Sequence, residues 1–234
     1  MEKSSINFLE ENFKDIKSRF SAAVERSGRK EGDVVLLAAT KTVSPEIINQ
    51  AINLGITHIG ENRVQEFLSK EKEINENVTR HFIGHLQTNK VKDIVGKVSM
   101  IESVHSVKLA KEIGKCSEKL GIVTDVLIEI NIGGEESKSG FSPEEVQNAI
   151  CEMSQIKGIK IKGLMCIPPI CDEDSQIREY FNRMHKLFID IGSQKRDNVS
   201  MEILSMGMSS DFEAAIECGS NLVRVGTALF GKRN

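Results

Sequence analysis

The chain has 234 residues, of which 39% are hydrophobic and 28% are charged, a composition that excludes a disordered or fibrous protein. Its 31 lysines and arginines nearly balance 34 acidic residues, and the net charge of −3 argues against general binding of nucleic acid or anionic lipid. No apolar run approaches the roughly 20 residues that a membrane span needs, and no signal-peptide core is present. We therefore expect a cytoplasmic protein.

The cysteines support this expectation. Their number is odd and they form no C-x-x-C pair, so we predict reduced thiols and neither a disulfide framework nor a metal site. The five positions are Cys116, Cys151, Cys166, Cys171 and Cys218.

Eight short apolar or β-branched runs alternate with helical patterns along the chain. An additional helix, at about residues 7–27, precedes the first strand. Later helices are marked by Ser44-Pro45-Glu46, by the capping box of Ser142 and Glu145, and by helical apolar spacing over residues 172–191. The predicted strands cover residues 34–39, 57–60, 81–84, 98–103, 124–131, 160–166, 201–205 and 222–225.

Eight strands separated by helices fit either an open doubly wound sheet or a closed barrel. The number of strands and the chain length, close to the roughly 250 residues typical of such barrels, favour closure. The turn after the first strand, residues 40–44, also lacks the glycines of a dinucleotide-binding turn. We predict an α/β fold, a single (β/α)8 TIM-barrel domain over residues 1–234 with an extra N-terminal helix.

Three polar residues stand where strands meet the expected active face of such a barrel. Lys41 follows the apolar first strand, where its ammonium is either paired, extended into solvent, or used to form an imine. Asn62 follows the second strand and either faces the barrel mouth or caps the next helix. Arg224, between two valines of the eighth strand, is a permanent cation able to hold a ligand acceptor atom.

The turns after strands seven and eight are rich in glycine and hydroxyl residues, at 205–211 and 224–227. Backbone amides in such turns bind anions, and these two barrel loops often hold a phosphate, although the same residues are also common turn formers. A lysine, an arginine and two phosphate-binding turns together describe a site for pyridoxal 5′-phosphate.

Six segments of the sequence closely resemble the pyridoxal-phosphate homeostasis protein family, which is similar to the N-terminal barrel of alanine racemase. They cover residues 39–42, 59–66, 81–90, 131–140, 204–209 and 223–231. Arg63 and Arg80 stand where this family commonly has other residues, which affects only the expected rim of the pocket. The resemblance implies Lys41 as the Schiff-base lysine, Asn62 near the ring, Arg224 at the ring nitrogen, and Ser205, Ser209, Gly226 and Thr227 around the phosphate.

The same resemblance bears on catalysis. Alanine racemase uses a tyrosine from a second domain as its other acid–base group, whereas the sole tyrosine here, Tyr180, lies in a predicted surface helix. An arginine at the ring nitrogen disfavours protonation there, which weakens the cofactor as an electron sink. We therefore expect a monomeric, non-catalytic carrier that acts in vitamin B6 and amino-acid balance and exchanges the cofactor with PLP-dependent apoenzymes.

Two enzymatic alternatives stay open. One is a single-domain amino-acid racemase or decarboxylase in which His85 or Lys138 supplies the missing base. The other is a Schiff-base aldolase in which Lys41 attacks a sugar phosphate without a cofactor. Lys138 and Lys232 are further candidates for a second, transient cofactor site, or else are ordinary surface lysines.

Overall fold

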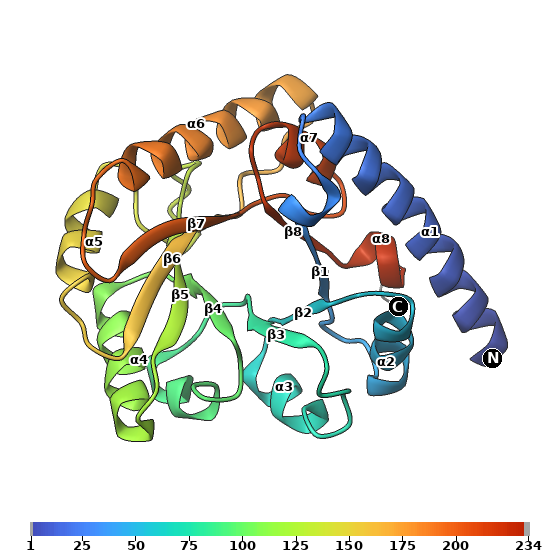
Figure 1. Cartoon of the computed structure of the whole chain (residues 1–234), viewed down its shortest axis with the longest axis horizontal. Helices are drawn as coiled ribbons and strands as arrows, with labels where there is room; N and C mark the ends of the chain where they lie inside the picture. Colours follow the sequence, from blue (N-terminus) through green and yellow to red (C-terminus); the bar gives the residue numbers. More distant parts are fainter. Residues whose placement is uncertain (1, 232–234) are drawn as a thin grey trace.

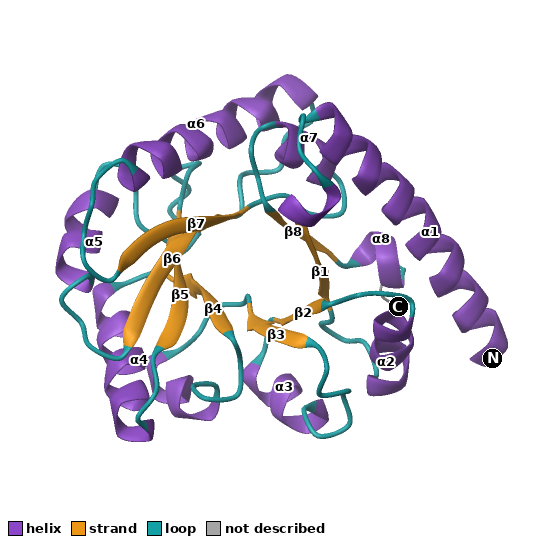
Figure 2. Ribbon diagram, viewed as in Figure 1, coloured by secondary structure: helices purple, strands orange, loops and turns teal. Residues whose placement is uncertain are grey.

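The computed structural model describes residues 2–231, with side chains from residue 7 onward, so Lys232 lies outside the described residues. Eight parallel strands close into a barrel in chain order, with β8 hydrogen-bonded to β1, which confirms the predicted (β/α)8 fold. Figure 2 shows the strands as an inner ring and the helices around it. The strands are β1 Val35–Ala39, β2 His58–Glu61, β3 Thr79–Phe82, β4 Met100–Val104, β5 Thr124–Ile130, β6 Ile159–Cys166, β7 Val199–Ser205 and β8 Leu222–Val225.

Helices connect the strands on the outside of the barrel (Figure 1). A 3-10 helix, η2, replaces an α-helix between β3 and β4. No helix within residues 2–231 is long and apolar enough to cross a membrane. The helices are α1 Glu2–Arg26, α2 Pro45–Asn53, α3 Val64–Lys70, α4 Val107–Leu120, α5 Val146–Met153, α6 Asp174–Gly192, α7 Phe212–Glu217 and α8 Thr227–Phe230, with 3-10 helices η1 Glu31–Asp33 and η2 Thr88–Asp93.

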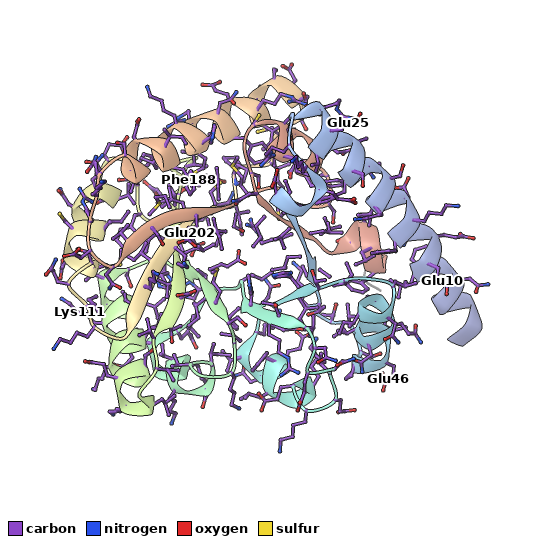
Figure 3. All side chains as sticks on the ribbon, viewed as in Figure 1. Glu10, Glu25, Glu46, Lys111, Phe188 and Glu202 are labelled. Atoms are coloured by element: carbon purple, nitrogen blue, oxygen red, sulfur yellow. The ribbon has the colours of Figure 1, made fainter. Side chains whose placement is uncertain are left out.

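The predicted N-terminal helix is present as α1, which runs along α7 and α8 (Figure 1). Leu9, Ile16 and Phe20 share one face of the helix and are buried, as their spacing requires. Glu10 and Glu25, on the other side, point away from the barrel (Figure 3). The apolar face of α1 thus covers the part of the barrel that ends in β8.

Strand ends differ from the prediction by up to two residues. β3 ends at Phe82 and not at residue 84, because the chain there turns in against the end of β2. A Cβ at Gly84 would lie 2.1 Å from the Asn62 carbonyl oxygen, an approach that only glycine permits. The reciprocal Ser142–Glu145 hydrogen bonds predicted for a capping box are present, at 3.2 and 3.3 Å, but they close a turn before α5, which begins at Val146. The Ser44 side chain makes no capping bond to α2.

The main hydrophobic core lies between the strands and the helices. Side chains on the opposite face of the strands point into the barrel and form two separate small apolar clusters. Leu37, Ile83 and Leu222 make one of them, and Met100, Leu127 and Met165 make the other. Charged residues share this interior, and they lead directly to the candidate site.

Candidate functional site

A pocket of about 610 Å³ opens at the carboxyl ends of the strands. It brings together every predicted site residue except Ser205, from four separate segments of the chain. Neither Arg63 nor Arg80 lines it, so both departures from the family pattern lie away from the pocket wall. The lining residues are Ala39, Lys41, Asn62, Ile83, Ile167, Met208, Ser209, Ser210, Arg224, Gly226, Thr227 and Ala228.

Lys41 lies in a tight turn that follows β1. Its neighbour Thr40 is fully buried, Lys41 itself is half-buried, and Thr42 has a left-handed φ of 63°. A β-branched residue rarely adopts this conformation without being held there. From this turn Lys41 contributes to the pocket wall.

Asn62 lies beside Lys41 at the end of β2. Its side-chain oxygen Oδ1 is buried and has no hydrogen-bond partner. The N-cap residue of α3 is Arg63, which makes no side-chain capping bond, so Asn62 does not cap this helix. A buried amide oxygen without a partner, on a pocket wall, is an acceptor that a polar ligand would satisfy.

Arg224 is 4% exposed, and its guanidinium reaches into the barrel interior. Nη2 donates a hydrogen bond to the Cys166 carbonyl oxygen at 2.8 Å, and Nη1 donates to the Ser205 hydroxyl. The Ser205 hydroxyl donates in turn to Glu102 Oε2 at 2.6 Å. Glu102 Oε1 lies 2.6 Å from His81 Nδ1, so a continuous hydrogen-bonded chain runs from Arg224 to His81.

This chain holds Glu102 as an anion. Burial alone would raise the pKa of Glu102, but the hydrogen bond with His81, the charge of Arg224 and the hydrogen bond from Ser205 lower it below the usual range. The carboxylate lies 4.0 Å from Arg224 Nη1 and is completely buried. These contacts hold the guanidinium, a permanent cation, in place beside the pocket.

Ser205 is the one predicted site residue that does not line the pocket. It is fully buried between Arg224 and Glu102, and its contact with a phosphate stays a prediction. The physical reason is strand alternation: its neighbour Leu204 packs into the main core, which turns Ser205 toward the barrel interior. Its hydroxyl links Arg224 to Glu102.

The remaining phosphate candidates converge where β7 and β8 end. The Ser209 hydroxyl accepts hydrogen bonds from the Gly226 and Ala228 amides at 3.1 and 3.2 Å. Thr227, exposed at the start of α8, lies between these two amides on the pocket wall. The two amides thus fix the Ser209 oxygen, and the hydroxyl groups of Ser209 and Thr227 are the donors that an anion could use here.

The two candidate bases lie elsewhere. His85 stacks on His105 with ring centroids 4.3 Å apart, and its Nδ1 lies 3.1 Å from the Ser139 hydroxyl. Lys138 donates to the Pro168 carbonyl oxygen at 3.2 Å and pairs with Glu135. Neither lines the pocket, and Tyr180 packs against the main core from α6.

Sequence reasoning missed several charged residues on the strands of the barrel. Glu61, Glu102 and Glu129 each lie near the carboxyl end of a barrel strand, and an acid buried in a strand is itself a signal that a charge partner faces it. Burial raises the pKa of Glu129 against the lowering effect of Arg224, and one of its carboxyl oxygens is buried without a partner. Among the described residues no three His, Cys, Asp or Glu side chains gather as metal ligands.

Comparison with known proteins agrees with this geometry. The pyridoxal phosphate homeostasis protein of Aquifex aeolicus is 46% identical over 224 residues, which cover 95% of this chain and 97% of that protein. Its counterpart in Escherichia coli K12 is 32% identical and covers 98% of both chains. These relatives match essentially their whole length.

Solved structures show the same relationship. PipY of Synechococcus elongatus with PLP bound has a TM-score of 0.82 and 28% identity, covering 95% of this chain and all of that one. An alanine racemase of Clostridium difficile, at 17% identity and a TM-score of 0.74, shares the fold over 97% of this chain and 56% of its own length. The family profile described as alanine racemase, N-terminal domain, matches residues 11–234. The chain therefore belongs to the pyridoxal phosphate homeostasis proteins, whose barrel is the alanine racemase N-terminal domain.

Proposed function

We propose that this protein is a non-catalytic carrier of pyridoxal 5′-phosphate that serves the homeostasis of this cofactor and, through it, vitamin B6 and amino-acid balance. The observation that carries the proposal is the pocket itself. It joins Lys41, Asn62 and Arg224 to the hydroxyl groups of Ser209 and Thr227, and a relative of the same fold binds this cofactor.

The residues fit the group that the family implies. When bound, the cofactor supplies an aldehyde that condenses with a lysine amine to give a Schiff base and one water. Lys41 is the amine on the pocket wall, and the Asn62 oxygen is an unsatisfied acceptor beside it. Arg224 presents a fixed cation to the ring nitrogen.

The phosphate end of the pocket supplies only neutral donors. The Ser209 and Thr227 hydroxyls would bind the phosphate, and the amides of Gly226 and Ala228 hold the Ser209 oxygen so that its hydroxyl proton can be donated. These contacts would hold the phosphate without a covalent bond. The Schiff base would lower the concentration of free aldehyde, and because an imine hydrolyses reversibly, the cofactor could still be released. This combination suits storage and delivery.

Two features favour a carrier over a catalyst. Hydrogen bonds through Ser205 to Glu102 hold Arg224, a permanent cation, beside the pocket, and a cation at the ring nitrogen opposes the protonation that helps the cofactor to stabilise a carbanion. In addition, the pocket wall, as far as the described residues form it, includes neither His85 nor Lys138, the two candidates for a second acid–base group.

The proposal is tested by the visible absorbance of the protein with added pyridoxal 5′-phosphate, before and after borohydride. We expect an imine band, and after reduction a covalent adduct on the Lys41 peptide. Lys41→Ala should lose band and adduct, whereas Lys138→Ala should keep the Lys41 adduct. A wild-type protein that stays colourless would refute cofactor binding, and exchange of an amino-acid α-proton with solvent would refute the non-catalytic assignment.

We further propose a monomer with one barrel domain over residues 1–234 that acts in the cytoplasm and exchanges the cofactor with PLP-dependent apoenzymes. The five free thiols are typical of a reducing compartment. Transfer to an apoenzyme is measured by the recovery of its activity on mixing with the loaded protein, with the Lys41→Ala variant as the control. A second, transient site at Lys138 stays a prediction.

A further inference from the structure

A buried ion cluster lies directly behind the turn that carries Lys41. Its centre is Lys70, the last residue of α3, whose side chain is only 5% exposed. Lys70 Nζ donates hydrogen bonds to the Thr40 carbonyl oxygen at 2.8 Å and to the Val43 carbonyl oxygen at 3.2 Å. A second lysine therefore binds the backbone on both sides of Lys41.

Two glutamates complete the cluster. Glu61 is 2% exposed, and its Oε1 lies 2.6 Å from Lys70 Nζ. Glu66, one helical turn before Lys70, pairs with the same ammonium at 3.0 Å. Burial raises the pKa of Glu61, while the hydrogen bonds from Lys70 and Thr40 and the charge of Lys70 oppose this change.

Both carboxylates also hold the turn. The Thr40 hydroxyl donates to Glu61, and the Thr42 amide donates to Glu66. All three residues around Lys41 in the turn, namely Thr40, Thr42 and Val43, are thus tied to one cluster. Since Thr42 has a left-handed φ of 63°, these bonds maintain a conformation that the chain would not keep alone.

The burial of Lys70 needs an explanation beyond packing. Taking an ammonium out of water is unfavourable, and a buried ion pair is often no more stabilising than apolar residues of the same volume. Here the partners of the ammonium are the turn itself and the two acids that hold the turn. The cluster therefore binds the backbone on both sides of Lys41.

We propose that Lys70 is a positioning residue for Lys41. It fixes the turn of residues 40–43 so that the Lys41 amine faces the pocket, and the rate of Schiff-base formation depends on this second lysine, which does not react. The bond chemistry is unchanged: the Lys41 nitrogen adds to the aldehyde carbon, a C=N bond forms, and the carbonyl oxygen leaves as water. This inference rests on the proposed function.

The test measures two properties of Lys41. The first is the rate constant for imine formation with pyridoxal 5′-phosphate, followed by absorbance. The second needs no cofactor: the rate at which acetic anhydride labels Lys41, followed by mass spectrometry. We expect Lys70→Met to slow imine formation at least tenfold and to change the rate at which acetic anhydride labels Lys41. Lys70→Arg should restore part of the rate of imine formation because it keeps the cation.

The matched control is Lys97→Met. Lys97 also pairs with a glutamate near α3, Glu71, at 2.8 Å, but it is 40% exposed and contacts nothing in the turn. We expect wild-type rates from this variant. A loss equal to that of Lys70→Met would attribute the effect to lysine removal in general and overturn the proposal.

Two further variants address folding. Lys70→Met/Glu61→Gln removes the buried cation together with its buried counter-charge, so the loss of rate should persist in a folded protein. Glu66→Ala alters a side chain that is 20% exposed and removes the acceptor of the Thr42 amide, and it should slow the reaction several-fold. Wild-type rates in Glu66→Ala or in the folded double variant would overturn the positioning role.

These outcomes remain distinct from failure of the proposed function. If wild-type protein forms no imine, cofactor binding is refuted, while the labelling of Lys41 still reports whether Lys70 positions it. If wild type forms the imine and every Lys70 variant forms it equally fast, only the positioning role is refuted.

Discussion

Removal of the Glu102 carboxylate tests the buried chain that fixes Arg224. Glu102 is completely buried, accepts hydrogen bonds from Ser205 and His81 at 2.6 Å each, and lies 4.0 Å from the guanidinium. Glu102→Ala leaves Arg224 as a buried cation without its acid and deprives Ser205 of its acceptor. Breaking a buried pair in this way costs about 3–5 kcal/mol of unfolding free energy.

The effect should depend on pH in a definite direction. The folded-state pKa of Glu102 is lowered, so its contribution is complete above the pKa of an unfolded glutamate, at about 4.3, and is lost as the pH falls through the folded value. The stability difference between wild type and Glu102→Ala should therefore be constant near neutrality and shrink in acid below about pH 4.3.

Urea unfolding followed by circular dichroism at several pH values measures both quantities. The control is Glu202→Ala, which removes a carboxylate that pairs with Lys162 at 2.6 Å but is 54% exposed. An exposed pair of this kind contributes about 0–1 kcal/mol. If Glu102→Ala and Glu202→Ala destabilise the protein equally, the reasoning that gives Arg224 a buried, charged partner is wrong.

Two other predictions concern the turn after β7 and the buried thiols. Gly207 has a φ of 93°, and a Cβ there would lie 2.4 Å from the Ala215 Cβ. Gly207→Ala should therefore destabilise the protein by more than about 1 kcal/mol, measured by thermal unfolding, and weaken cofactor binding. An unchanged melting temperature would contradict this expectation. Burial raises the pKa of the Cys166 thiol to about 12, whereas Cys151 is exposed. Iodoacetamide at neutral pH should therefore label Cys151 in the native protein and Cys166 only after unfolding, which mass spectrometry of the labelled peptides measures.

Prediction from sequence was most accurate for periodic features. The eight strands, their order, the N-terminal helix and the capping box at Ser142 all follow from local apolar spacing and local hydrogen bonding, which need no knowledge of distant contacts. The end of β3 was misplaced because it depends on the approach of Gly84 to the backbone of Asn62, a contact between two strands.

The candidate site shows the same division. Lys41, Arg224 and the turns at Ser209 and Thr227 were predictable because the closed barrel gathers all strand ends at one mouth. The position of Ser205 was not predictable, because it depends on which face of β7 meets the interior of the barrel. The partners of Lys70 were not predictable either, because α3 and the Lys41 turn meet only in the folded chain.

The sequence by itself therefore predicted the barrel, the position of Lys41 at its mouth and the polar residues that accompany it, since these depend on residue types and their spacing. Only the tertiary structure decided how the charges are paired. Glu102 with Arg224 and Lys70 with Glu61 are brought together from different strands and helices. Their pairing is a matter of distance and burial, and electrostatic energies change severalfold over a few ångströms in a site that excludes water.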